Sequence, residues 1–141
     1  MFTRAIVAAL KAQWPEHKVY IDDVKQYLTP PCFVIRQADT AYQLLFGENR
    51  SVRCSYAIYY YPLDNAKREE LQQMGLALCQ VLELLWHEGL GYWASGMQHR
   101  IVEHALLLTL SYTYRYRTIE EPELMETLQH TVSMGDDKNG K

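Results

Sequence analysis

The stretch that decides the fold is GMQHRIVEHALLLTLSYTYRYRT, residues 96–118. From His104 onward its side chains alternate between two chemical kinds, as in a strand whose successive side chains point to opposite faces. One face carries His104, Leu106, Leu108, Leu110, Tyr112, Tyr114 and Tyr116, and the other carries Ala105, Leu107, Thr109, Ser111, Thr113, Arg115 and Arg117. An amphipathic helix would not place tyrosine at every second position, and aromatic and β-branched residues favour strands. The stretch therefore predicts one long strand.

This strand is longer than a compact domain of this size can enclose. At roughly 3.3 Å per residue, residues 103–117 would reach about 50 Å. A domain of 141 residues has a radius of gyration of about 14 Å and so spans about 40 Å. Part of the strand should bend or extend beyond the body, where its backbone groups need a partner. This is a first indication that the protein assembles with other chains.

Upstream of the long strand, the sequence predicts one helix and several strands. Apolar residues at three- and four-residue spacing indicate an amphipathic helix over residues 3–13, which Pro15 ends. Short strands are predicted over residues 18–22 and 32–37. A second long strand, over residues 50–61, alternates between the two faces in the same way as the first.

Residues 38–47 are ambiguous. Tyr42, Leu44 and Phe46 alternate with smaller or polar residues, which suits a strand. A loop with an apolar clamp fits the same residues, so both interpretations stay open.

The remaining elements follow the second long strand. Residues 66–87 carry an apolar stripe at helical spacing and predict the longest helix, which the glycines that follow would end. Residues 92–97 predict a further strand, joined to the long strand through a turn or bulge near His99 and Arg100. A last helix is predicted over residues 121–130.

Together these elements predict an α+β fold in the order α-β-β-β-α-β-β-α, with helices packed on one face of a mainly antiparallel sheet. Residues 1–130 should form a single domain. Residues 131–141 are a polar tail that we expect to be disordered.

The composition excludes several classes of protein. No apolar stretch approaches the length of a membrane span, and no signal-peptide pattern is visible, so we expect a soluble protein made in a cytoplasm. The three cysteines form no CxxC pair and indicate reduced, buried thiols. The net charge of -3 lacks the basic excess of a typical nucleic-acid binder. Eleven tyrosines suit a core or a protein interface.

No motif predicts catalysis, a cofactor or a metal site. His87 and Glu88 do not belong to an HExxH motif, and a polar pair at the end of a helix commonly forms a solvated cap. His99, Glu103 and His104 suggest a metal cluster, but residues 103 and 104 point to opposite faces of a strand. The tyrosine runs could stack with single-stranded nucleic acid only beside a basic groove, and few arginines are at hand. We therefore expect no enzyme activity and no cofactor.

Several stretches together resemble the tail-terminator family of tailed bacteriophages and prophages. They are the N-terminal helix closing on Trp14-Pro15, VYIDDVKQYLTPPCFVI (residues 19–35), RCSYAIYYYP (residues 53–62) and SGMQHRIVEHALLLTLSYTY (residues 95–114). The resemblance covers residues 2 to about 128 and is one of overall pattern. The family has no motif that fixes functional residues, so none is carried over.

The resemblance implies a structural protein of the virion tail, made in the cytoplasm of the bacterial host. It would form a hexameric ring on the last ring of the tail tube, stop tube polymerisation and offer the surface that joins the head connector. Its partners would be other copies of itself, the tube protein, the connector and, in a contractile tail, the sheath protein. DNA would only pass through the lumen of the ring.

A ring requires interfaces between subunits, and the strand faces indicate where these lie. We expect the apolar set Val52, Tyr56, Ile58, Leu106, Leu108 and Leu110 in the subunit core. The polar and aromatic set Arg53, Tyr59, Tyr61, Arg115 and Arg117 is predicted to be available to neighbouring subunits, because tyrosine and arginine often carry interface energy.

An alternative function belongs to another class. A small-molecule-binding or enzymatic α+β domain would hold its ligand in a pocket between the long helix and the sheet. His99, Glu103 or Tyr112 would then serve as polar contacts in that pocket.

Overall fold

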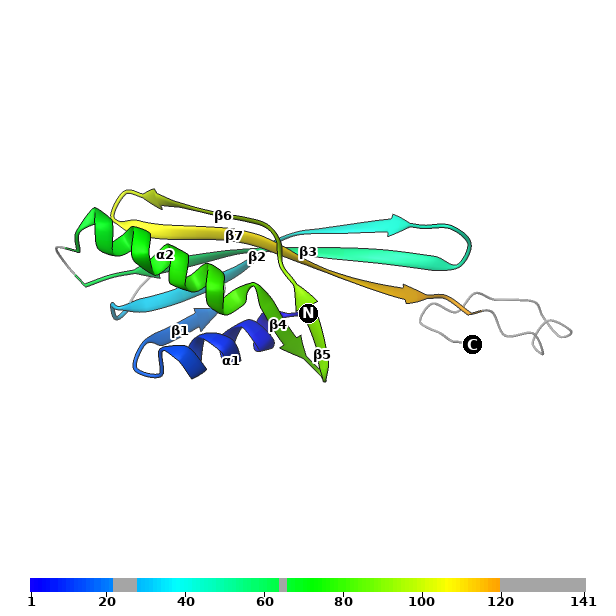
Figure 1. Ribbon diagram of the computed structural model, residues 1–141, viewed down its shortest axis with the longest axis horizontal. Helices are drawn as coiled ribbons and strands as arrows, with labels where there is room; N and C mark the ends of the chain where they lie inside the picture. Colours follow the sequence, from blue (N-terminus) through cyan, green and yellow to red (C-terminus); the bar gives the residue numbers. More distant parts are fainter. Residues whose placement is uncertain (22–27, 64–65, 120–141) are drawn as a thin grey trace, which may run out of the picture. The chain divides into compact units, whose positions relative to one another are not determined.

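A computed structural model describes residues 1–21, 28–63 and 66–119 of the chain. Its elements are α1 (Thr3–Gln13), β1 (Lys18–Ile21), β2 (Cys32–Leu44), β3 (Asn49–Tyr61), α2 (Arg68–Leu82), β4 (Leu84–His87), β5 (Leu90–Trp93), β6 (Ser95–Val102) and β7 (Ala105–Arg117) (Figure 1). The α+β class with a predominance of sheet is consistent with this architecture. The predicted order α-β-β-β-α-β-β-α is wrong, because four strands follow α2. The predicted helix over residues 121–130 and the polar tail over residues 131–141 lie outside the described residues.

The main correction concerns the end of the long helix. We predicted a helix over residues 66–87, but α2 ends at Leu82 and Leu84–His87 form a strand paired antiparallel with β5. Glu88 and Gly89 connect the two strands with φ angles of 54° and 82°. Two successive positive φ angles are typical of the tight turn that joins hairpin strands. The backbone amide of Ala94 then donates to the Glu83 carbonyl over 2.8 Å, which closes the base of the hairpin.

The larger sheet has five strands in the order β1-β2-β3-β7-β6. β1 runs parallel to β2, whereas β6 and β7 form an antiparallel hairpin. The predicted turn or bulge near His99 and Arg100 lies elsewhere, because these residues pair regularly with Leu108 and Leu107. The register instead shifts between Ser95 and Gln98, around Gly96 with its φ of 63°.

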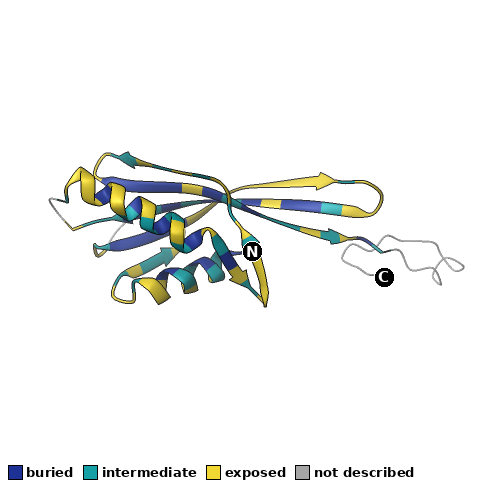
Figure 2. Cartoon of the chain, viewed as in Figure 1, coloured by how far each residue is buried: buried dark blue, intermediate teal, exposed yellow. Residues whose placement is uncertain are grey.

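Most of residues 38–47, which the sequence left ambiguous between strand and loop, belong to strand β2. This strand continues to Leu44, so the alternation of Tyr42 and Leu44 does belong to a strand. Residues 32–35 are buried and every later residue of β2 is exposed (Figure 2).

The chain forms two compact units. The first comprises Met1–Thr40 and Cys54–Thr113, and the second comprises Ala41–Arg53 and Tyr114–Lys141. Both helices, β1, β4, β5 and β6 belong to the first unit. The described part of the second unit contains the end of β2, the beginning of β3 and the end of β7, and it contains no helix.

Most of the buried hydrophobic residues belong to the first unit, where the sheet packs against the two helices, and Val52 belongs to the second. Alternating residues of β3 and β7 are buried, and the predicted core set Val52, Tyr56, Ile58, Leu106, Leu108 and Leu110 is buried throughout. Two tyrosine hydroxyls join this face of the sheet to helix ends. Tyr56 accepts a hydrogen bond of 2.8 Å from the amide of Phe2, just before α1, and Tyr112 donates over 2.6 Å to the carbonyl of Leu82, the last residue of α2. These bonds satisfy backbone groups that helix termini leave without partners.

The buried tyrosine of β7 predicts how stability depends on pH. Burial, and to a lesser extent the nearby Tyr56, raise the pKa of Tyr112 above its ordinary value. In the unfolded chain this hydroxyl ionises at about pH 10. The contribution of Tyr112 to stability is therefore complete below that pH and is lost as the pH rises further. We expect the free energy of unfolding to fall above pH 10, and to fall less steeply in Tyr112→Phe. Urea titrations at a series of pH values measure both slopes, and equal slopes would contradict the prediction.

Candidate functional site

Two of the predicted interface residues lie side by side on β3. Tyr59 and Tyr61 are two residues apart, so both point to the face of the sheet opposite Tyr56 and Tyr60. Their rings stack with centroids 6.1 Å apart and an interplanar angle of 15°. The guanidinium carbon of Arg36, on β2, lies 5.6 Å from the Tyr59 centroid, within the range of a cation–π contact. Both tyrosines are half-buried, and burial raises the pKa of Tyr61.

The same face of the first unit is polar and aromatic. Ser55 of β3 and Ser111 of β7 share a hydrogen bond of 2.8 Å between their hydroxyls. The described helices bond to the other face, through Tyr56 and Tyr112. This face therefore carries hydrogen-bonding groups and flat aromatic surface, which are suitable for protein contacts.

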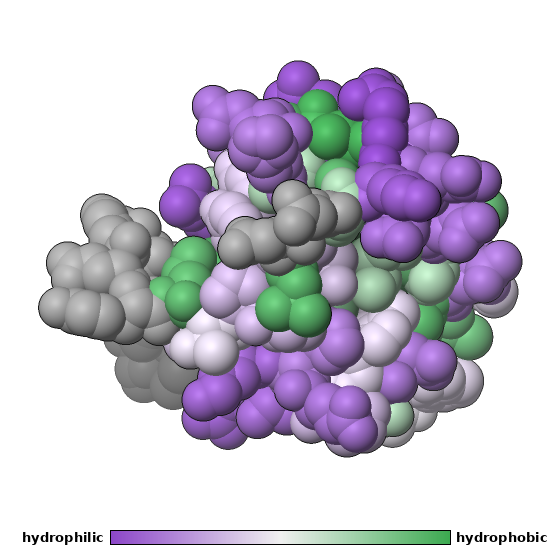
Figure 3. All heavy atoms as spheres, turned by 90° about the vertical axis from the view of Figure 1, so that its left-hand side faces the viewer, coloured by the Kyte–Doolittle hydropathy of each residue, from purple (hydrophilic) through white to green (hydrophobic). Residues whose placement is uncertain are grey.

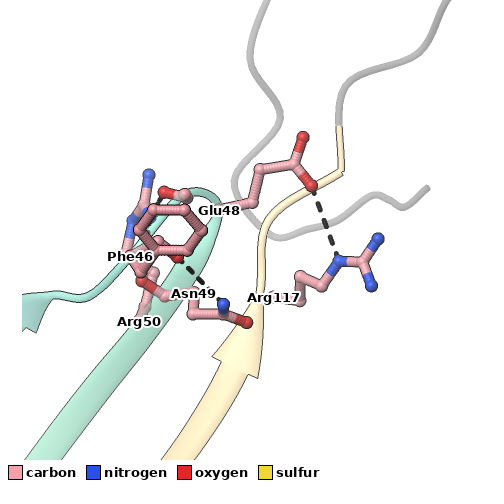
Figure 4. A network of polar contacts seen from close by, with 6 residues as sticks. Phe46, Glu48, Asn49, Arg50 and Arg117 are labelled. Carbon is pink, nitrogen blue, oxygen red and sulfur yellow. Dashed lines mark hydrogen bonds and ion pairs between the residues drawn. The ribbon is translucent and has the colours of Figure 1, made fainter.

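The three predicted arginines belong to the second unit. Arg53, Arg115 and Arg117 are all exposed. The Nε of Arg117 lies 3.5 Å from a carboxylate oxygen of Glu48 (Figure 4), and the two side chains are 68% and 53% exposed. An ion pair this exposed contributes little to stability, so the arginines remain available to a partner.

The turn between β2 and β3 is held by its own polar contacts (Figure 4). The side-chain amide of Asn49 donates to the Phe46 carbonyl over 2.9 Å, and the guanidinium of Arg50 donates to the carbonyls of Gly47 and Asn49. Gly47 adopts a φ of 66°, a conformation that glycine tolerates best. The backbone amide of Thr118 donates to the Glu48 carbonyl over 2.9 Å, which ties the residue after β7 to the turn.

Sequence reasoning missed three exposed apolar residues near this turn. Tyr42, Leu44 and Phe46 are 56%, 66% and 92% exposed. The Tyr42 hydroxyl accepts a hydrogen bond of 3.2 Å from Tyr116. The alternation of the three residues was visible in the sequence, but their exposure was not, because alternation alone does not say whether a second layer covers that face.

The second unit brings part of the predicted set together with a missed residue. A shallow pocket of about 370 Å³ is lined by Leu45, Phe46, Asn49, Arg115, Tyr116 and Arg117. Tyr59 and Tyr61 belong to the first unit and do not line it. The predicted interface residues thus include a tyrosine pair on β3 and, beside the exposed Phe46, Arg115 and Arg117; Arg53 is exposed but does not line this pocket.

The residues proposed for the alternative function do not converge. The Tyr112 hydroxyl is buried against Leu82, and the ring of His99 lies against Gly75, where an added Cβ would come within 2.5 Å of it. Glu103 lines a pocket of about 670 Å³ at the end of the first unit where α2 begins, together with Pro62, Leu63, Ala66, Arg68, Leu71, Ile101 and His104. Figure 3 views this end, where hydrophobic residues lie between hydrophilic ones. Neither His99 nor Tyr112 is among the described residues that line this pocket.

Two kinds of site are absent from the described part of the chain. No group of three or more histidine, cysteine, aspartate or glutamate side chains is placed there to hold a metal ion. Neither of its helices has the length and apolar character needed to cross a membrane.

Comparisons with known proteins give one family. A family model described as "Phage tail terminator protein" matches residues 2–125. Among curated proteins, none matches the chain. One similar solved structure is 19% identical, with 81% of this chain and 88% of that chain covered and a TM-score of 0.44. A similarity this low carries no information about function.

Proposed function

This chain belongs to the phage tail terminator family, and we propose that it forms a ring, expected to be hexameric, which caps the tail tube. The family is structural, so the chain is a component of the phage tail. The capping ring would stop tube polymerisation and present the surface to which the head connector joins. The tube protein, the connector and, in a contractile tail, the sheath protein would be its partners, and DNA would pass through the lumen.

The observation that best supports self-assembly is the second unit. Three or more strands need a packed hydrophobic face to be stable on their own. The described part of this unit has three strand segments and no helix, and it leaves Tyr42, Leu44 and Phe46 exposed. Another molecule that covered these residues would supply a second layer beside the described strand segments.

A closed ring also requires a particular kind of interface. Subunits in a ring meet head to tail, so each copy must present two different surfaces that are complementary to each other. We propose that the tyrosine pair Tyr59 and Tyr61 and the arginines Arg53, Arg115 and Arg117 contribute to these surfaces. Tyrosine and arginine suit this role, because they are enriched among residues that dominate binding energy.

Deletion of the gene tests the function directly. Without a terminator, tube subunits would continue to add, and the tube end would lack the surface that receives the head. We expect electron micrographs of particles from the deletion strain to show tails of uncontrolled length or tails without heads. Expression of the intact gene in the same strain should restore normal particles.

The opposite result would be decisive. Tails of normal length joined to heads, produced by the complete deletion, would remove the terminator function. The protein would then act as a tail component at some other step of assembly.

A further inference from the structure

A groove with a floor of alanines lies between the two helices of the first unit. Ala5, Ala8, Ala9 and Ala12 recur at three- and four-residue spacing along α1, which places them on one side of that helix. Across from them lie Ala77 and Val81, four residues apart on α2. The groove has a volume of about 690 Å³ and is lined by Ala5, Ala8, Ala9, Ala12, Gln13, Ala77, Gln80, Val81, Leu84, Leu85 and Trp86. None of these residues is charged.

One wall of the groove is an exposed tryptophan whose ring lies against a glycine of the neighbouring strand. Trp86 is 64% exposed and lies on β4 opposite Gly91 of β5. A Cβ on Gly91 would come within 3.3 Å of the Trp86 ring, so the indole lies across the glycine. Trp93 pairs with Leu84 and is 68% exposed, which extends the apolar surface along the hairpin. An aromatic wall beside a floor of small residues is suitable for binding large apolar side chains.

The chain carries a surface of the complementary kind at the end of β2. Tyr42, Leu44 and Phe46 are large, exposed and spaced two residues apart. The segment that holds them, TAYQLLFG over residues 40–47, contains no charged residue. One surface is therefore concave and lined mostly by small side chains, whereas the other presents large side chains. Phe46 lies beside Arg115 and Arg117, whose exposed guanidinium groups would stay in water at the rim of such a contact.

We propose that the alanine groove of one copy binds the Tyr42, Leu44 and Phe46 side chains of the next copy. This inference rests on the proposed ring, because head-to-tail closure needs two different complementary surfaces on each subunit. A second copy is preferred over another tail protein because the concave surface and the surface with protruding apolar side chains occur on the same chain. Contact between them would cover both in one interface, which repeats around the ring.

Filling the groove tests the inference. Ala8→Trp adds a large side chain at an exposed position of α1 that lines the groove, and Lys11→Trp adds the same side chain at an exposed position of α1 outside it. Phage carrying Ala8→Trp or Phe46→Ala should show a fall of about tenfold or more in the fraction of particles with tails of normal length. Phage carrying Lys11→Trp should assemble normally. Circular dichroism of the purified variants checks that each is folded.

Cross-linking identifies the partner. In a Cys79→Ser background, particles that carry both Ala8→Cys and Glu48→Cys, an exposed position two residues after Phe46, should yield covalent multimers of this chain after mild oxidation, and particles with either cysteine alone should not. Normal assembly of Ala8→Trp, or a cross-link from Glu48→Cys to a different tail protein, would overturn the inference. Tails of normal length without multimers from the double-cysteine variant would overturn it too, while leaving the proposed ring intact. Normal tails from the gene deletion would instead overturn the function itself.

Discussion

A chain carrying both Arg115→Ala and Tyr59→Ala should remain folded and fail to assemble on the ends of tail tubes. Arg115 is exposed, and Tyr59 is half-buried on the sheet face opposite the helices, so neither side chain belongs to the core. Truncation of a residue that dominates an interface costs about 2 kcal/mol or more of binding energy. In the proposed ring, the loss of two such residues from every subunit would be repeated at each interface.

Two measurements separate assembly from folding in this variant. Electron microscopy of particles from a mutant prophage should show tails of uncontrolled length or tails without heads. Circular dichroism of the purified variant should match that of the unchanged protein. Arg100→Ala is a matched control, because Arg100 is an exposed arginine on β6 outside the predicted set. Normal tails from the double variant would place the interface on other residues, while leaving the terminator function intact.

The second large effect concerns stability. Leu78 and Leu82 of α2 are fully buried. Leu78→Ala or Leu82→Ala removes buried methyl groups and leaves a cavity, which should lower the free energy of unfolding by about 2–5 kcal/mol. Denaturant titration of each purified variant measures the loss.

The same helix provides the control. Leu76 lies two residues from Leu78 but is 57% exposed, so Leu76→Ala should change stability much less. Equal stabilities for Leu76→Ala, Leu78→Ala and the unchanged chain would show that the buried side of α2 is assigned wrongly.

Elements with strong local patterns could be predicted from the sequence. The helix predicted over residues 3–13 coincides with α1, and the strand predicted over residues 50–61 differs from β3 by one residue. The alternation in residues 104–117 correctly indicated β7. In each case a single periodicity runs through the whole element, so the local pattern and the packing agree.

The β4–β5 hairpin could not be predicted in the same way. Leu85 and Trp86 continue the apolar stripe of α2, so the helical pattern extends past the true end of the helix at Leu82. The hairpin turn is formed by Glu88 and Gly89, whose backbones both adopt positive φ angles. Such turns usually carry asparagine, aspartate or glycine at both positions, and here only Gly89 is of that kind, so the sequence did not mark the turn clearly.

The candidate site was predicted only in part. Tyrosine and arginine indicated an interface by residue type, and the structure leaves the predicted residues exposed or half-buried. The alanine groove had no signal of its own, because alanines on a helix usually indicate only helix propensity. Its existence depends on how α1 packs beside α2, which is a property of tertiary structure.

The position of β7 in the sheet has a consequence for biosynthesis. β7 lies between β3 and β6, although more than forty residues of chain separate it from β3. Pairing between distant segments is slow, because the entropy of closing the loop between them is lost before the strand contacts form. A ribosome adds about 5–20 residues per second. The edge of β3 that pairs with β7 therefore stays unpaired for seconds, until residues 105–117 have emerged. The free edge of β3 therefore gains its partner only after residues 105–117 have been synthesised.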